Sequence, residues 1–535
     1  MNEAVMSSPK TARPMLVAGA VSLAAFMEVL DTTIANVALS HIAGSLGASS
    51  EESTWVLTSY LVSNGIVLPL SGWLSGVMGR KKFFLACILG FTVTSFLCGI
   101  STSLPMLIVC RLLQGFAGGG LQPSQQSIIK DSFPPEKLGM AFAITGITTV
   151  LAPILGPVSG GFITDNFSWR WIFFMNIPVG LVALFLVNVF VEDPPTAQKK
   201  KAGPVDYIGL GLIGLGLGTL QVVLDKGQQE DWFDSNFILL FAITSFISLL
   251  VAVFWLLRQK NPVIELKLFK IPSFTMPCIM IFFVGFALYS SAMLLPMEVQ
   301  ADFGYDATLA GFVLSPSGVA TLLMMPIAGR LVNRIQGKYL ISFGMFVTAV
   351  GMWVTGMVTP QTDYNTFVWV RILQIVGLPF LFVPASTMAF SQITPEHSSN
   401  ASAIMSLMKN LGGSIGIALV TNKLIHSQQI EQAYLTEHLN AASTTYQNVF
   451  SGYVHHFMQM GFPSILTLDE ARYAALYKIY QQAGVQASLL AYRDTYNFIA
   501  GILIVLAIAA LFMPKDHHHK TVHQRAVVET SKENA

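Results

Sequence analysis

About fourteen stretches of this chain are apolar for roughly 20 residues at a time, long enough to cross a ~30 Å hydrocarbon layer as a helix. Inside lipid the backbone must satisfy its own hydrogen bonds, so runs of this length fold as helices. We therefore predict an all-α polytopic membrane protein. The expected spans lie near residues 16–38, 53–73, 83–101, 106–128, 139–161, 171–191, 205–224, 237–257, 272–296, 307–329, 338–358, 367–389, 401–422 and 496–513.

The composition agrees with a membrane protein. The 535 residues are 53% hydrophobic and 11% charged, whereas soluble proteins carry about 25% charged residues. Too little polar surface remains to cover a water-soluble particle of this size. The net charge of +1 argues against nucleic acid as a partner. The four cysteines all lie in apolar stretches, so we expect buried thiols and not a disulfide framework.

Basic residues mark one side of the expected membrane protein. Lys and Arg cluster in alternate loops and in the C-terminal tail, while the loops near 39–52, 102–105, 297–306 and 359–366 have almost none. By the positive-inside rule, the basic loops and both termini are cytoplasmic, which requires an even number of spans. The basic set is Arg80, Lys81, Lys82, Lys130, Lys137, Lys199, Lys200, Lys201, Arg258, Lys260, Lys267, Lys270, Arg330, Arg334, Lys338, Lys515 and Lys520.

One external loop, residues 424–494, is much longer than the others. It contains an amphipathic helical pattern, LDEARYAALYKIYQQAG, and polar runs. Long loops without structure are uncommon in compact proteins, so this one is functional or independently folded. It is either a solvated helical hairpin that caps the outer face or a docking site for another protein.

The sequence repeats itself weakly. Segments 111–114 (RLLQ) and 371–374 (RILQ) correspond, as do the basic turns within 72–84 and 329–340. Two correspondences in the same order indicate two related halves, with a helix pair inserted between them. Parallel repeats of this kind build transporters with a mid-membrane substrate site at the interface between the halves. We expect an N-terminal six-helix bundle (1–200), an inserted pair (201–262) and a C-terminal six-helix bundle (263–535).

Two acids, Glu28 and Asp31, interrupt the first span. A carboxylate at membrane depth costs roughly 2.5–3.5 kcal/mol, so it is rarely there by accident. A spacing of three residues places both acids on one helix face. Burial beside a like charge favours the neutral acid, which can then load and release a proton near neutral pH. Alternatively, the pair only hydrogen-bonds neighbouring helices. If Asp31 carries the proton, Asp31→Asn should abolish substrate-driven proton release and leave folding intact.

Two cations, Arg111 and Lys409, also lie within expected spans. A guanidinium is always charged, so Arg111 needs an acid or carbonyl groups in the bundle. Asp31 is the candidate partner, and the alternative is an arginine that reaches the membrane interface. Lys409 faces the same choice, and its neighbours Asn410, Gly412, Gly413 and Gly416 predict a tightly packed helix.

The fifth span contains ITTVLAPILGPVSGG, residues 147–161. Prolines and glycines at Pro153, Gly156, Pro157 and Gly160 allow a bend and close backbone approach in a bundle. This helix is either a hinge between the halves or a packing element.

Sequence motifs for other functions are absent or out of context. Residues 209–214, GLGLIG, match a dinucleotide fingerprint formally but lie in an apolar helix without a preceding strand. No P-loop, metal-ligand cluster or catalytic triad pattern is present in the sequence. We therefore expect a secondary transporter with no cofactor and no metal, and not an enzyme.

These motifs together resemble the major facilitator superfamily, specifically the fourteen-helix drug:proton antiporters of the EmrB/QacA type. The resemblance covers nearly the whole chain. Its motifs are LDTTIANVAL (30–39), GWLSGVMGRKK (72–82), RLLQGFAGGGLQP (111–123), LAPILGPVSGG (151–161), SWRWIFFMNIPVG (168–180) and LDKGQQEDWF (224–233).

The resemblance implies proton-coupled export of hydrophobic or amphipathic compounds across a bacterial inner membrane by alternating access. It implies partners as well: protons, membrane lipids, a periplasmic adaptor of the EmrA type and an outer-membrane channel. The loop-two motif usually carries an acid at the position of Gly76, so the charge relay of that gate loses this acid and Arg80 acts alone.

Three groups of site residues follow from the motifs and the resemblance. Proton coupling is assigned to Asp31, Glu28 and Arg111. The substrate cavity is assigned to Asn36, Gln114, Gln374, Lys409 and Asn410. Gating and hinge motion are assigned to Gly72, Gly79, Arg80, Pro153, Gly156, Pro157 and Gly160.

Two other functions remain open. On the same fold, the cargo could be one endogenous lipid, fatty acid or siderophore. A membrane sensor or a lipid-modifying enzyme is a remote alternative, and the sequence shows no catalytic constellation that supports an enzyme.

Overall fold

The computed structural model describes residues 13–192, 206–259, 262–439, 443–459 and 467–513. These residues form helices and no strand. Part of the predicted basic set lies outside the described residues, namely Lys199, Lys200, Lys201, Lys260, Lys515 and Lys520. Fourteen helices in the described part are long and apolar enough to cross a membrane, which confirms the predicted fold class.

The helices fall into three consecutive groups along the chain. The N-terminal helices are α1 (Pro14–Val37), α2 (Leu39–Leu46), α3 (Ser50–Ser53), α4 (Trp55–Met78), α5 (Arg80–Gly99), α6 (Leu104–Gly118), α7 (Leu121–Ser132), α8 (Leu138–Asn166), α9 (Trp171–Phe174) and α10 (Asn176–Phe190). The inserted pair is α11 (Tyr207–Lys226) and α12 (Asn236–Arg258). The C-terminal helices are α13 (Pro272–Ala301), α14 (Ala307–Leu331), α15 (Gly337–Thr355), α16 (Tyr364–Val376), α17 (Leu378–Phe390), α18 (Ser398–His438), α19 (Thr444–Gln459) and α20 (Leu468–Leu511). Short 3₁₀ turns are η1 (Pro135–Lys137), η2 (Trp232–Asp234) and η3 (Leu266–Lys270).

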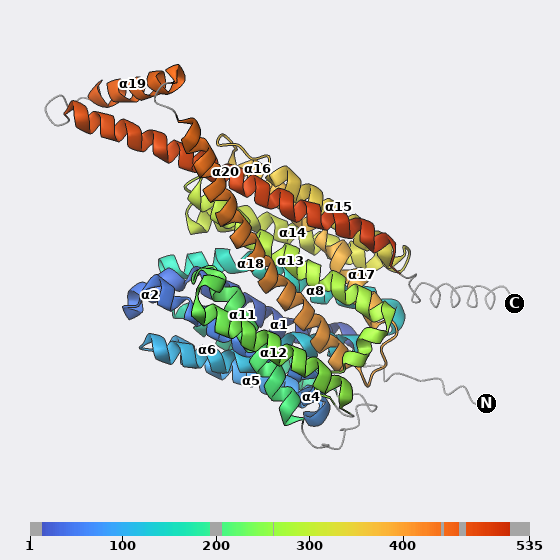
Figure 1. The fold of residues 1–535 in the computed structure, drawn as a ribbon. Helices are drawn as coiled ribbons and strands as arrows, with labels where there is room; N and C mark the ends of the chain where they lie inside the picture. Colours follow the sequence, from blue (N-terminus) through green and yellow to red (C-terminus); the bar gives the residue numbers. More distant parts are fainter. Residues whose placement is uncertain (1–12, 193–205, 260–261, 440–442, 460–466, 514–535) are drawn as a thin grey trace, which may run out of the picture.

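The molecule has two distinct ends. The described basic loops lie together at one end, which we call the basic end, and α19 lies at the opposite end, which we call the hairpin end (Figure 1). Helix α1 begins at the basic end and α20 finishes there (Figure 1). At the hairpin end, three helices start with side-chain caps: Ser103, Asp306 and Asp363 accept hydrogen bonds from the backbone of the first turns of α6, α14 and α16. Such caps satisfy donors that would otherwise stay unpaired at a helix start.

The N-terminal and C-terminal helices meet along two long contacts. Helix α8 packs along α14, and α4 packs along α18. Glycines make the first contact close, because a Cβ at Gly139 would overlap Gly329 and Val332 of α14. A side-by-side arrangement with small residues at the contact is typical of membrane helices.

The predicted tight packing around Lys409 is confirmed. Helix α18 lies against α13, and a Cβ at Gly412 would overlap the backbone of Phe282. In return, a Cβ at Gly285 of α13 would overlap the carbonyl group of Lys409. The two backbones therefore approach as closely as glycine allows, and this fixes the height of Lys409 in the bundle.

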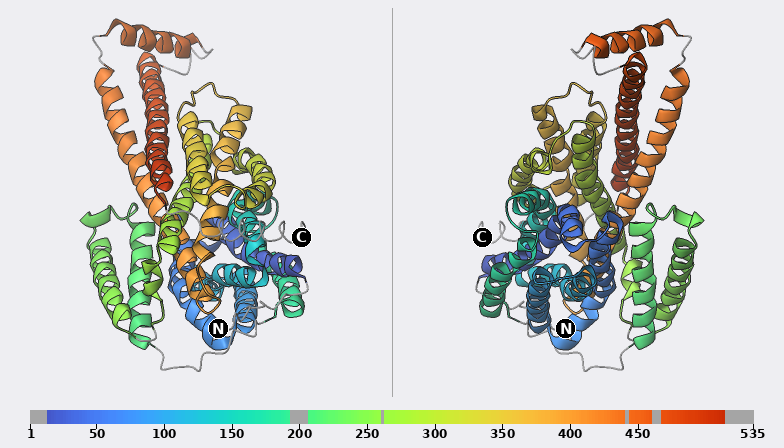
Figure 2. Two further views of the ribbon diagram at one scale, coloured as in Figure 1. Left: turned by 90° about the vertical axis from the view of Figure 1, so that its right-hand side faces the viewer. Right: turned by 90° about the vertical axis from the view of Figure 1, so that its left-hand side faces the viewer.

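The inserted pair stands at one edge of the molecule (Figure 2). Helix α11 packs on α12, on α4 and, by a smaller contact, on α18. Gln221 of α11 accepts a hydrogen bond from Ser414 of α18 at 3.1 Å. The inserted pair thus contacts both an N-terminal helix, α4, and a C-terminal helix, α18.

The long external loop is a helical hairpin. Helices α18 and α20 continue far beyond the other helices, and α19 crosses their tip (Figure 2). The amphipathic pattern in 468–484 forms the first part of α20, which begins with a capping box between Thr467 and Glu470. Of the two readings of 424–494, the geometry of a hairpin is therefore observed, and whether it docks another protein is a separate question.

Candidate functional site

A buried ion pair joins the first and fourth spans. Arg111 Nη1 of α6 lies 2.6 Å from Asp31 Oδ2 of α1, and both side chains are buried. Arg111 Nε also donates to the carbonyl oxygen of Val56 at 3.2 Å. The expected partnership of these two residues is thus present, and the alternative of an arginine reaching the membrane interface does not match its burial.

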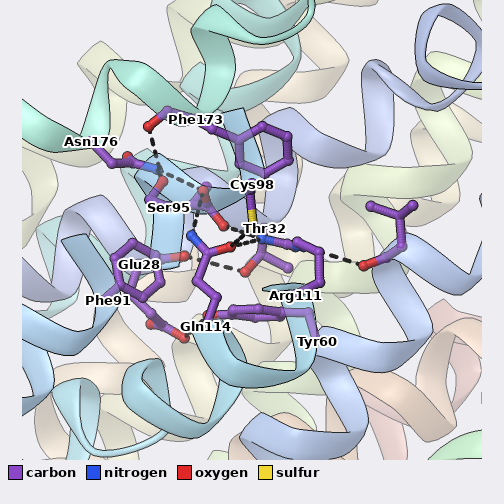
Figure 3. A network of polar contacts seen from close by, with 12 residues as sticks. Glu28, Thr32, Tyr60, Phe91, Ser95, Cys98, Arg111, Gln114, Phe173 and Asn176 are labelled. Atoms are coloured by element: carbon purple, nitrogen blue, oxygen red, sulfur yellow. Dashed lines mark hydrogen bonds and ion pairs between the residues drawn. The ribbon is translucent and has the colours of Figure 1, made fainter. Parts of the chain in front are cut away.

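Amides surround the ion pair (Figure 3). Gln114 stands one helical turn after Arg111, accepts from its Nη1 at 2.7 Å and donates to Asp31 Oδ1 at 3.2 Å. Asn176 Nδ2 of α10 donates to the same oxygen at 2.6 Å. Each oxygen of Asp31 therefore has a donor, which makes its charge tolerable at this depth.

Aromatic rings enclose the guanidinium. The ring of Tyr60 lies 4.2 Å from Arg111 Cζ and that of Phe173 lies 5.6 Å from it. A desolvated cation gains from the negative faces of such rings. The site is therefore buried and charged.

Glu28 forms a separate cluster on the same helix. Its Oε1 accepts from Tyr60 Oη and Asn64 Nδ2, both at 3.1 Å, and its Oε2 accepts from Gln122 Nε2 at 2.6 Å. All these donors are neutral. Tyr60 contacts both clusters, since its hydroxyl bonds Glu28 while its ring covers Arg111.

Lys409 joins this cluster from the other side of the repeat. Its ammonium group donates to Gln122 Oε1, so one amide connects a cation of α18 with the carboxylate of Glu28 in α1. Lys409 is buried, and Asn410 beside it is half-buried. The chain Glu28–Gln122–Lys409 crosses the contact between N-terminal and C-terminal helices, and any separation of these helices must break it.

Two predicted cavity residues lie away from this network. The side chain of Asn36 is exposed, one turn beyond Asp31 on α1. Gln374 accepts from Arg371 Nη1 at 2.9 Å and donates to Thr355 Oγ1 at 2.8 Å, entirely within the C-terminal helices. The structure therefore brings Gln114 and Lys409 into the networks of the two acids and does not bring Asn36 or Gln374 there, while Asn410 lies beside Lys409 on α18.

The glycines of the fifth-span motif hold α8 against α1. A Cβ at Gly156 would overlap Thr33, and one at Gly160 would lie 3.3 Å from Val37 Cβ. Pro153 and Pro157 lie inside α8 without ending it. The motif thus sets the position of the helix that carries Asp31, two residues before Thr33.

A second polar network closes the basic end. Arg80 forms an ion pair with Asp131 of α7 and donates through Nη2 to the carbonyl oxygen of Pro395 at 2.6 Å. The expectation that Arg80 acts alone is therefore wrong: without an acid at position 76, the carboxylate comes from Asp131. Lys130 adds bonds to the carbonyl oxygen of Ile393 at 2.5 Å and to Ser398 Oγ at 2.8 Å.

The structure shows why two of the predicted gating residues, Gly72 and Gly79, are glycines. Gly79 has φ 88° and ψ 145° where α4 turns into α5, a backbone conformation open essentially to glycine. A Cβ at Gly72 would overlap Asn400 of α18. Gly79 therefore permits the turn from α4 into α5, and Gly72 permits the close contact of α4 with α18.

Sequence reasoning missed several members of these networks. Four are neutral polar residues whose importance comes from partners distant in sequence: Tyr60, Asn64, Gln122 and Asn176. The fifth is the acid Asp131. Gln122 and Asn176 lie within motifs that were noted for their resemblance, and a polar residue in an apolar helix was the available signal.

The sequence profile of the Major Facilitator Superfamily matches residues 21–416 of this chain. The chain belongs to the major facilitator superfamily. It is 34% identical over 488 residues to the multidrug export protein EmrB of Escherichia coli K12, covering 91% of this chain and 93% of that protein. It is 36% identical over 447 residues to the fatty acid resistance protein FarB of Neisseria gonorrhoeae, covering 83% and 87%.

Solved structures support the fold of this family member. A double tryptophan variant of XylE aligns with a TM-score of 0.58 at 14% identity, covering 95% of this chain and 97% of XylE. The human organic anion transporter MFSD10 aligns with a TM-score of 0.53 at 13% identity, covering 92% and 99%. At such identities the likeness concerns the fold alone.

Proposed function

We propose that this protein is a proton-coupled multidrug efflux transporter that exports hydrophobic and amphipathic compounds by alternating access. The supporting relatives include EmrB proteins and the probable multidrug resistance protein EmrY of Escherichia coli K12, which is 37% identical over 421 residues. The observation that best supports proton coupling is the buried Asp31–Arg111 ion pair inside the N-terminal helices.

The mechanism follows from the charges of this pair. With Asp31 ionised, the carboxylate holds Arg111, and two amides fix both groups. When Asp31 takes up a proton, its attraction for Arg111 is lost and the guanidinium must find another acceptor. Movement of α1 against α6 is then coupled to one proton, and Thr33 against Gly156 transmits it to α8.

Alternating access requires breaking one set of contacts between the two helix groups at a time. We assign residues 1–200 and 263–535 to two six-helix bundles that rock, with 201–262 as the inserted pair. Arg80, Asp131, Lys130 and Ser398 form contacts at the basic end, and in this proposal these contacts hold that end closed. The hydrogen-bonded chain Glu28–Gln122–Lys409 lies deeper in the bundle and breaks when the basic end opens. We assign to it the coupling of proton binding to substrate binding.

The basic end faces the cytoplasm in this proposal, and the membrane is a bacterial inner membrane. The hairpin then extends into the periplasm. Its exposed side includes Tyr473 (78% exposed) and Tyr477 (60% exposed) of α20. Exposed aromatic residues are typical of binding surfaces, and we assign this surface to an adaptor of the EmrA type that connects to an outer-membrane channel. A pulldown from native membranes with Tyr473→Ser/Tyr477→Ser should lose the adaptor, and equal recovery would contradict the assignment.

The coupling is tested in liposomes that contain the purified protein and an imposed pH gradient. Wild-type protein should drive a fluorescent amphipathic dye against its gradient and release protons on binding the dye. Asp31→Asn should do neither. Unchanged dye transport by Asp31→Asn would end the proposed mechanism.

A fatty acid is the second candidate cargo. The likeness to FarB and the buried ammonium group of Lys409, which can pair with a carboxylate, favour it. A long-chain fatty acid that competes with dye transport in wild-type protein and fails to compete in Lys409→Met would support this cargo.

A further inference from the structure

A third buried acid lies in the C-terminal helices, outside the clusters of Asp31 and Glu28. Glu298 stands on the last turn of α13 at the hairpin end and is 2% exposed. Its Oε2 accepts a hydrogen bond from Tyr496 Oη of α20 at 3.0 Å. Among the described residues no Lys or Arg forms an ion pair with it. A buried carboxylate without a cation is unfavourable, so Glu298 holds a proton in this conformation.

A buried cation also lies near Tyr496. Arg371 of α16 is 0% exposed, and its Nη1 bonds only to Gln374. Its Nε and Nη2 are buried without a partner in the described part of the chain. Tyr496 is fully buried and within electrostatic reach of Arg371 as well as bonded to Glu298. The same phenol is therefore close to a carboxyl group without a cation and to a guanidinium without an anion.

Glu298 and Arg371 can stabilise each other in a second conformation, in which Glu298 is ionised. If Glu298 loses its proton, its negative charge needs a stabilising partner. The guanidinium of Arg371, whose Nε and Nη2 are buried without a partner in the described part of the chain, can provide it. The pair therefore has a protonated, separated state and an ionised, joined state.

A path for the proton leads to the hairpin end. Asp302 lies one helical turn beyond Glu298, and Ser488 of α20 donates to its Oδ2 at 2.9 Å. Partial burial raises the pKa of Asp302 from its ordinary value, with the Ser488 bond opposing this change. Tyr492 of α20 is the other titratable group beside both acids. Asp302 can thus pass protons between solvent and Glu298.

We propose that Glu298 is a second proton-binding site, loaded from the hairpin end through Asp302, and that its ionised form pairs with Arg371. The inference rests on the proposed proton-coupled export and adds a site in the C-terminal helices. The transporter then moves more than one proton per cycle, with one site on each side of the repeat.

Two measurements on the full-length protein test this site. The first is infrared difference spectroscopy between low and high pH, which reports the carbonyl band of a protonated carboxyl group. Glu298→Gln should lose a glutamic acid band, and Glu298→Asp should shift it. The second is proton release per bound dye in detergent, where Glu298→Gln should release about one proton fewer than wild type.

The outcomes separate the two proposals. If wild-type protein releases no proton on binding dye, the proposed function fails. If it does release protons and both Glu298 variants keep the wild-type band and proton count, the second site is overturned and the Asp31 mechanism stands. If Glu298→Gln does not fold, Glu298→Asp decides alone, because an unshifted band overturns the proposal and a shifted band supports it.

Discussion

The two halves of the repeat place an arginine and a glutamine in the same way and complete them differently. Arg111 and Gln114 stand on α6, and Arg371 and Gln374 stand at matching places on α16. In the N-terminal helices the glutamine also reaches the carboxylate of Asp31, whereas in the C-terminal helices it reaches the hydroxyl group of Thr355. The repeat thus conserves the geometry of a buried cation within the molecule, and only one half provides an anion in contact with it. The two buried arginines therefore differ in their surroundings, since an anion contacts Arg111 and, among the described residues, an amide alone bonds to Arg371.

The largest effect is expected for Asp31→Asn. It leaves Arg111 buried without its anion, which should lower the free energy of unfolding by about 3–5 kcal/mol as well as abolish dye transport. The structure thus changes the expectation that this variant folds as well as wild type. Melting in detergent and transport in liposomes measure the two effects. Adding Arg111→Gln should restore melting but not transport, and an unchanged melting temperature for Asp31→Asn alone would contradict the argument.

Gly156→Ala should come next. The added methyl group meets Thr33 and pushes α8 from the helix that carries Asp31, at a cost of about 1–3 kcal/mol. Gly65→Ala in α4 is the matched control, because a Cβ there meets nothing within 4 Å. Melting of both variants in the same detergent compares them. Equal melting temperatures would show that α8 is not tightly held against α1.

Arg371→Gln should change stability much less than Arg111→Gln. It removes a buried cation that has no ion-pair partner, so the free energy of unfolding should change by less than about 1 kcal/mol or increase. Arg111→Gln instead leaves Asp31 without its cation. Equal losses of stability in the two single variants would remove the asymmetry between the halves.

The smallest effect concerns pH. Because burial raises the pKa of Asp302 in the folded protein, the unfolded chain loses this proton first, and stability falls as pH rises above the ordinary aspartate range. Asp302→Asn should flatten this part of the curve of melting temperature against pH. A steeper decline in Asp302→Asn than in wild type would reverse the sign and contradict the burial.

The sequence predicted the spans well, since the length of an apolar stretch is a local property and the thickness of the hydrocarbon layer sets the length that a spanning helix needs. It also paired Asp31 with Arg111, because two opposite charges at membrane depth have few other partners. It did not find Asn176, which lies far along the chain from Asp31 and has no charge to mark it. It left Arg80 without an acid because Asp131 lies on the next span, α6–α7, and becomes a partner only when α7 packs beside α5.

The sequence by itself determined a helical membrane protein with charges buried in its spans, because hydrophobic length and charge at membrane depth are properties of the local sequence. Only the tertiary structure decided which polar groups meet. Those meetings depend on glycine contacts between helices, such as Gly412 against Phe282, that set the height of each side chain to within an atom's width. For this reason Lys409 reaches Gln122, while Arg371 lies beside a phenol and not beside an acid.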